Sequence, residues 1–211
     1  PTRRSSDLRL QGLLDVAASL FAQRGYAATS MRDIALGVKM LRTEAKAAGL
    51  KPAFSILDAS DAMGIVSDIS KETEKSRLRA LVSRISGWKN AMLPPSAAAS
   101  HAADEMEAVA ARVYEEYERT LRAYQAVDFD DLIGLPARLL ASDEDLLERW
   151  QRRLRYLLID EYQDTNAGQY RMLRLLAGPR AAFTAVGDDD QAIYGWRGAD
   201  IENLRGLPRD Y

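Results

Sequence analysis

"LLIDEYQDTN", residues 157–166, runs an apolar segment directly into a group of acids. Asp160, Glu161 and Asp164 follow the apolar residues almost without a gap. Carboxylates held this close repel one another unless a cation lies between them. We therefore expect a cationic ligand at this point of the chain.

The same stretch belongs to a strand, helix, strand pattern. "YLLI" (156–159) is typical of a buried strand of a parallel sheet, "AGQYRMLRLLAG" (167–178) predicts a helix, and "AAFTAVGDDD" (181–190) is a second apolar run with acids after it. Both acidic groups then follow the carboxyl ends of strands, where open α/β sheets bind ligands. One carboxylate can hold a hydrated Mg²⁺ while its neighbour orients or deprotonates a water molecule. The alternative is a strand that ends in a solvated acidic turn.

Composition limits what the protein can be. Lys+Arg 29 against Asp+Glu 31 leave a net charge of -2, so a nucleic-acid contact requires a local basic face. The absence of cysteine excludes disulfides and thiolate zinc sites, and a single histidine excludes a histidine metal cluster. No apolar run approaches the roughly 20 residues of a membrane span. We therefore expect a soluble, cytoplasmic protein with no membrane partner.

Residues 1–35 differ in character from the rest. "PTRRSSDL" (1–8) can be encoded by a sequence similar to the end of a sequencing-library adapter; a short solvated terminus is the alternative. An apolar stripe over residues 10–21 and the capping-box spacing of Ser30 and Asp33 predict two helices. "LLDVAASLFAQRGYAATSMRDIA" (13–35) resembles the start of TetR-type transcriptional regulators. The helix that reads the major groove in that family is not visible, so the alternative is a helix pair that only packs.

Residues 36–126 are predicted to be mostly helical. Apolar faces in 76–92 and in 104–124, the latter starting at Met106, indicate two core helices, and "PPSAAASHAA" (94–103) between them predicts a loop leading into a helix. A further helix is predicted over 142–154, with Ser142 as its cap. A solvated helix surface is favoured over a nucleic-acid-binding face for four basic residues, Arg77, Arg79, Arg84 and Lys89.

Three segments carry a second resemblance. "VDFDDLI" (127–133), "DEYQDTN" (160–166) and "VGDDDQAIYGWRGA" (186–199) strongly resemble motifs of superfamily 1 DNA helicases of the UvrD/Rep type. The likeness covers residues 36–211. It implies an α/β fold that is mostly helical overall: a helical insertion domain (36–126) and part of a RecA-like P-loop NTPase motor domain (127–211).

The resemblance also implies roles for single residues. Asp160 and Glu161 correspond to the ligands for the Mg²⁺ of MgATP. Glu161 also corresponds to the base that acts on the attacking water. Gln163 corresponds to the residue that couples the nucleotide site to neighbouring motifs, and Gln191 to the contact with the γ-phosphate.

The remaining roles concern DNA. Tyr194 and Trp196 resemble the aromatics on which bases of single-stranded DNA stack, and Arg197 resembles a link between nucleotide and DNA. Stacking on aromatic rings tolerates any base sequence, which suits a motor. The alternative is that Tyr194 and Trp196 are core aromatics.

The resemblance implies an ATP-dependent 3′-to-5′ DNA helicase of replication or repair, acting on single-stranded and 3′-tailed duplex DNA. No G-x-x-x-x-G-K-[ST] phosphate loop occurs in the sequence. We therefore expect an internal fragment that is inactive alone, joined near Ala35 and Leu36 to the TetR-like piece by an assembly chimera or a natural fusion. The competing function is a TetR-type DNA-binding regulator, whose all-helical ligand domain would have no acidic strand ends.

Overall fold

The computed structural model of the chain describes residues 31–180, 182–193, 195 and 198–210. The predicted helix over residues 10–21, its successor's cap Ser30, and Tyr194, Trp196 and Arg197 lie outside these residues. The elements in chain order are α2 (Met31–Thr43), β1 (Ser55–Ile56), α3 (Ala59–Ser70), α4 (Lys75–Asn90), α5 (Pro95–His101), α6 (Glu105–Tyr124), β2 (Ala126–Val127), α7 (Asp131–Ser142), α8 (Glu144–Arg153), β3 (Leu157–Ile159), α9 (Ala167–Ala177), β4 (Phe183–Ala185) and α10 (Glu202–Asp210). The described chain is thus mostly helical with a few short strands, as predicted.

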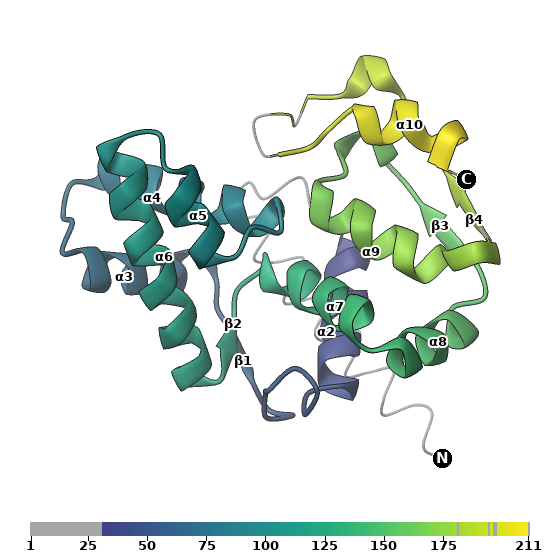
Figure 1. Cartoon of the computed structure of the whole chain (residues 1–211), viewed down its shortest axis with the longest axis horizontal. Coiled ribbons are helices and arrows are strands. Elements are labelled where there is room, and N and C mark those ends of the chain that lie inside the picture. The colour runs from purple at the N-terminus through teal and green to yellow at the C-terminus, as the bar shows by residue number, and fades with distance from the viewer. Residues whose placement is uncertain (1–30, 181, 194, 196–197, 211) are drawn as a thin grey trace.

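Helices α3 to α6 form one lobe, here called the helical unit (Figure 1). Its core lies where the apolar faces of α3, α4 and α6 meet, and includes Leu81, Ile85 and Tyr117. Two details of the sequence prediction are wrong. Met106 is 43% exposed, because the core side of α6 begins only a turn later. The segment "PPSAAASHAA" forms α5 instead of a loop, since Pro95 occupies the first turn of a helix, where a missing N–H costs nothing.

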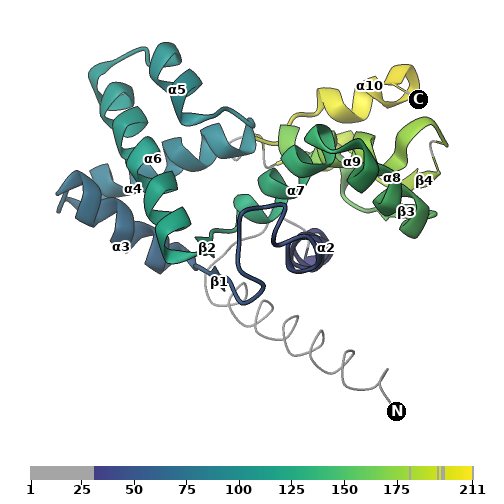
Figure 2. The same ribbon diagram turned by 60° about the horizontal axis from the view of Figure 1, so that its bottom comes forward.

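The second lobe, here called the body, contains α2 and α7 to α10 (Figure 2). Helices α2 and α7 pack in direct contact: a Cβ built on Gly37 would lie 1.9 Å from the carbonyl oxygen of Leu132. Only glycine allows this approach. The same α2 runs without interruption through Ala35 and Leu36, where the sequence had suggested a junction. The short parallel pair β1–β2 connects the body to the helical unit.

The two main strands pair as the sequence predicted. β3 and β4 are parallel, with Leu158 opposite Thr184, and α9 connects them. The prediction that "YLLI" is a buried strand is wrong, because Leu158 is 65% and Tyr156 63% exposed. Side chains alternate along a strand, and no described element covers the face that carries these two. None of the described helices is long and apolar enough to cross a membrane.

The cap of α8 also differs from the prediction. Ser142 is the last residue of α7, and Asp143 caps α8 by accepting a hydrogen bond from the backbone N–H of Leu146 at 2.9 Å. The physical reason is the backbone: Ser142 is still helical as the end of α7, whereas Asp143 has the extended backbone that a cap residue needs. Only one residue, Asp143, therefore separates α7 from α8.

Candidate active site

Two loops leave the carboxyl ends of β3 and β4 side by side. Beyond the strands, pairing continues through Val186 N–H to the Ile159 carbonyl at 2.8 Å and Tyr162 N–H to the Val186 carbonyl at 3.0 Å. The first loop begins with Asp160 and Glu161, both exposed, and Glu161 has a φ of 54°. This left-handed backbone is uncommon for a residue with a side chain and turns the chain sharply. Asp160 and Glu161 thus lie at the carboxyl ends of the strands.

Gln163 joins the two loops. Its side chain is 1% exposed; its Nε2 donates to Oε2 of Glu161 at 2.7 Å, and its Oε1 accepts from the backbone N–H of Asp188 at 3.0 Å. The second loop passes close by: a Cβ built on Gly187 would lie 2.8 Å from Oε1 of Gln163. A buried amide with both ends bonded fixes the carboxylate of Glu161 relative to the second loop.

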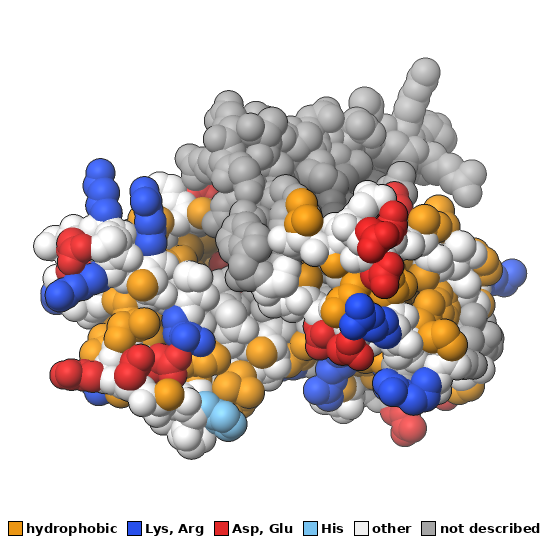
Figure 3. All heavy atoms as spheres, turned by 90° about the horizontal axis from the view of Figure 1, so that it is seen from above, with side chains coloured by type: hydrophobic (Ala, Val, Ile, Leu, Met, Phe, Trp, Pro, Cys, Tyr) orange, Lys and Arg blue, Asp and Glu red, His pale blue; other side chains and the backbone are white. Residues whose placement is uncertain are grey.

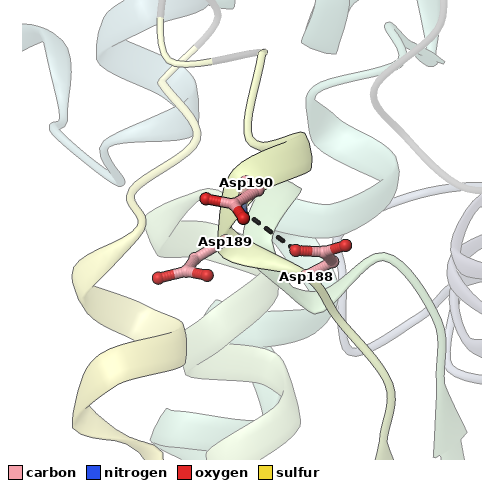
Figure 4. A group of neighbouring side chains, drawn as sticks. All are labelled: Asp188, Asp189 and Asp190. Carbon is pink, nitrogen blue, oxygen red and sulfur yellow. Dashed lines mark hydrogen bonds between the residues drawn. The ribbon is translucent and has the colours of Figure 1, made fainter.

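The second loop, Gly187–Gln191, is acidic. Asp188, Asp189 and Asp190 are exposed, and one carboxylate oxygen of each lies within 4.8 Å of the others (Figure 4). Asp188 accepts from the backbone N–H of Asp190 at 3.1 Å and from Nε2 of Gln191 at 2.7 Å. The backbone and side chain of Asp188 therefore link Gln163 to Gln191.

The first loop is also fixed at its far end. Asn166 caps α9 by accepting from the backbone N–H of Gln169 at 2.9 Å. Thr165 offers its carbonyl to the N–H of Asp200 at 3.1 Å and to Nδ2 of Asn203 at 2.9 Å. The chain beyond the second loop thus returns along the first, and α10 is anchored there.

The structure therefore brings Glu161, Gln163 and Gln191 to one edge of the sheet, next to Asp160. The contribution of Asp188 was missed from the sequence, although the second acidic group was recognised as lying at a strand end. Its signal was its position directly after Gly187, at the turn out of β4.

Lys89 is not the surface charge that the sequence indicated. It is 3% exposed, and its Nζ lies 2.7 Å from Asp128, 2.9 Å from Asp131 and 2.9 Å from Glu118. The sequence pattern placed Lys89 on a solvated surface of its helix. The carboxyl end of α4 instead packs against α7 and α9 of the body, so the side chain of Lys89 is buried. On the visible face of the helical unit, the remaining basic side chains stand among acidic ones and form no continuous basic surface (Figure 3).

Burial and charge act in opposite directions in this cluster. Burial alone lowers the pKa of Lys89, but Asp128, Asp131 and Glu118 outweigh it and raise the pKa well above its ordinary range. Burial, reinforced by the charge of Asp128, raises the pKa of Asp131 to about 7 and that of Asp130 to about 6. The cluster therefore holds more carboxyl groups than its single buried lysine can neutralise.

The fold and the two acidic loops fit one protein class. The chain belongs to the family described as the UvrD/REP helicase N-terminal domain, whose model matches residues 33–211. It is 45% identical over 179 residues to a protein named ATP-dependent DNA helicase Rep from Escherichia coli, covering 83% of this chain and 27% of that protein. It is 38% identical over 178 residues to ATP-dependent DNA helicase PcrA from Staphylococcus aureus, covering 82% and 24%. The chain spans about a quarter of the length of these curated relatives.

A second, short match covers residues 13–42 and is described as bacterial regulatory proteins, tetR family. Of this segment the structure describes residues 31–42, which form most of α2. That helix packs on α7 inside the body, and α7 lies within the helicase match.

The residues at the sheet edge fit the Mg²⁺ of a nucleotide. Mg²⁺ prefers carboxylate oxygens together with water, and it requires few protein ligands when phosphates complete its shell. The exposed carboxylates of Asp160 and Glu161, with the acidic second loop beside them, supply such oxygens.

Proposed function

We propose that this chain supplies the metal-binding and water-activating part of an ATP-driven DNA helicase motor. The observation that carries the proposal is the bridge from Glu161 through Gln163 to Asp188. Phosphoryl transfer depends on positioning and charge stabilisation more than on covalent chemistry. A base fixed by a buried amide, beside a carboxylate suited to Mg²⁺, is the arrangement such a reaction needs.

Each residue has a part in this proposal. Asp160 holds Mg²⁺, Glu161 orients and deprotonates the attacking water, and Gln191 contacts the γ-phosphate. MgATP supplies the electrophilic phosphorus and the charge that balances the acids. Gln163 keeps Glu161 in a fixed position relative to the loop that carries Gln191. The nucleotide and that loop therefore move together.

We further propose that the β3–β4 unit is part of a RecA-like motor domain (127–211), and that residues 36–126 form the helical insertion domain. Parallel strands with acidic carboxyl ends and a connecting helix support this assignment. The substrates proposed are single-stranded and 3′-tailed duplex DNA, contacted by Tyr194, Trp196 and Arg197. The relatives' names specify DNA only in general.

The test places the chain in a complete motor. Residues 33–211 replace the matching segment of the Escherichia coli relative, and DNA-stimulated ATP hydrolysis is measured. We expect turnover, and Glu161→Gln should lower kcat by at least about 100-fold because a positioned base contributes that much. Glu161→Gln should leave ATP binding nearly unchanged, since the substitution preserves size.

The matched control is Glu202→Gln, which removes an exposed carboxylate on α10 that pairs with Arg205. It should keep kcat within about two-fold, as expected of a surface change. An active graft in which Glu161→Gln is as harmless as Glu202→Gln would refute the role given to Glu161.

A further inference from the structure

The carboxyl end of α4 is where the helical unit meets the first loop of the site. Nδ2 of Asn90 donates to Oδ1 of Asp130 at 2.9 Å, and Oδ1 of Asn90 accepts from Nδ2 of Asn166 at 2.7 Å. One side chain therefore connects three segments: α4, the residues before α7, and the end of the loop that starts at Asp160.

Asn166 is held at both ends of its side chain. Its Nδ2 is bound to Asn90, and its Oδ1 accepts from the backbone N–H of Gln169 as the cap of α9. The bond to Asn90 and the cap bond therefore fix the same orientation of the Asn166 amide. With the acceptor on Asn90 removed, the amide can turn, and the cap of α9 loosens with it.

The end of α4 has little freedom to move by itself. Lys89 is fixed by three carboxylates within 2.9 Å, contributed by α6, β2's end and α7. Met92 has a φ of 61° and packs against the core shared by α7 and α9. Its sulfur lies 3.4 Å from the Cβ position of Gly168 in the first turn of α9. A displacement of the helical unit is therefore transmitted to the start of α9.

We propose that Asn90 is a positioning residue that couples the helical unit to the loop carrying Glu161. The connection runs from Asn90 through Asn166 into the loop, and from Gln163 to the N–H of Asp188. Its significance for ATP hydrolysis rests on the proposed function. The helical unit, which carries none of the proposed nucleotide-binding residues, then controls the orientation of the base.

The test uses the 211-residue chain and amide hydrogen exchange followed by NMR. The reporters are the amides of Gln169 and Asp188, and the Val186 amide, bonded to Ile159, reports general opening of the sheet. In Asn90→Ala we expect exchange about five-fold faster at Gln169, and a smaller increase at Asp188, because one hydrogen bond is lost. Exchange at Val186 should stay unchanged.

A charge-neutral swap separates positioning from simple loss of stability. Asn90→Asp keeps an acceptor for Asn166 but loses the donor to Asp130. Repulsion between the two carboxylates should push residue 90 away from its partners and accelerate exchange at Gln169. In the double variant Asn90→Asp with Asp130→Asn, the amide at residue 130 donates to the carboxylate at residue 90. That carboxylate still accepts from Asn166, so exchange at Gln169 should return toward the starting rate. The control is Ser83→Ala, an exposed position on α4.

Two outcomes would overturn the proposal: unchanged exchange at Gln169 in Asn90→Ala, or acceleration that is equal at Val186 and is not reversed by the swap. Exchange is measured without nucleotide or DNA. A failure here is therefore distinct from a failure of the proposed function, which would show as a graft whose hydrolysis ignores Glu161→Gln.

Discussion

Nζ of Lys89 lies 2.7 Å from Oδ2 of Asp128, and the same oxygen accepts a hydrogen bond from the hydroxyl of Tyr117 at 3.0 Å. This contact joins α4 and α6 of the helical unit to the segment that enters α7. Replacing Lys89 by Met keeps most of the unbranched side chain but leaves buried carboxylates without their cation. We expect Lys89→Met to lower the free energy of unfolding by about 3 kcal/mol at neutral pH.

Urea denaturation is the measurement for Lys89→Met, with Lys75→Met as the matched control. Lys75 is the exposed first residue of the same helix, so its replacement should change the free energy of unfolding by less than about 0.5 kcal/mol. Equal effects of the two substitutions would show that the buried cluster does not hold the lobes together.

The second prediction concerns pH. Because the folded pKa values of Asp130 (about 6) and Asp131 (about 7) exceed the ordinary 3.8, their stabilisation is complete only below about pH 4. It is lost as pH rises through 6 to 7. Together the two groups lose about three pKa units of stabilisation over this range, so we expect the free energy of unfolding to fall by up to about 4 kcal/mol between pH 5 and 7.5. Asp131→Asn should make the free energy of unfolding less dependent on pH. Urea denaturation at several pH values measures this, and the same pH dependence in the variant and the original chain would contradict the raised pKa of Asp131.

The third prediction tests the close approach of the two loops. A methyl group at residue 187 would displace the side-chain amide of Gln163, which is bonded at both ends. In the grafted motor, Gly187→Ala should lower kcat for ATP by about ten-fold or more, because small misplacements of catalytic groups are costly. Gly64→Ala is the control, since a Cβ there meets nothing within 4 Å. Equal kcat values for both variants would argue against the Gln163 bridge.

The fourth prediction concerns the 211-residue chain alone. Its sequence contains the acids but no G-x-x-x-x-G-K-[ST] loop to hold a triphosphate. Phosphate release should therefore stay at background with or without single-stranded DNA, and no duplex should unwind. Hydrolysis by this chain that DNA stimulates and Glu161→Gln removes would contradict the expectation.

The fifth prediction addresses DNA. If bases stack on Tyr194 and Trp196, the chain should prefer single-stranded to duplex DNA, and replacing both aromatics by alanine should remove most of this preference. Fluorescence anisotropy with labelled oligonucleotides measures the effect. Tyr124→Ala, at an aromatic that is 67% exposed on the helical unit, is the control and should have no effect. A preference that survives the double substitution would assign DNA binding to other residues.

The sequence alone determined the local parts of this protein. The apolar runs before Asp160 and Asp188 predicted two parallel strands with acids at their carboxyl ends, and the structure has both strands, joined by α9. The motifs led to the helicase family, which the comparison confirmed over residues 33–211. These inferences succeed because periodicity, capping and motif spacing depend on residues close together in the chain.

Only the tertiary structure decided which distant residues meet. Lys89 reads as a solvated charge in its own helix, yet it is buried because acids 29 to 42 positions later, at Glu118, Asp128 and Asp131, surround it. Asn90 and Asn166 are 76 residues apart and share a hydrogen bond that no local pattern marks. Such contacts depend on how whole helices pack, and a polar side chain takes its role from the partners that packing brings to it.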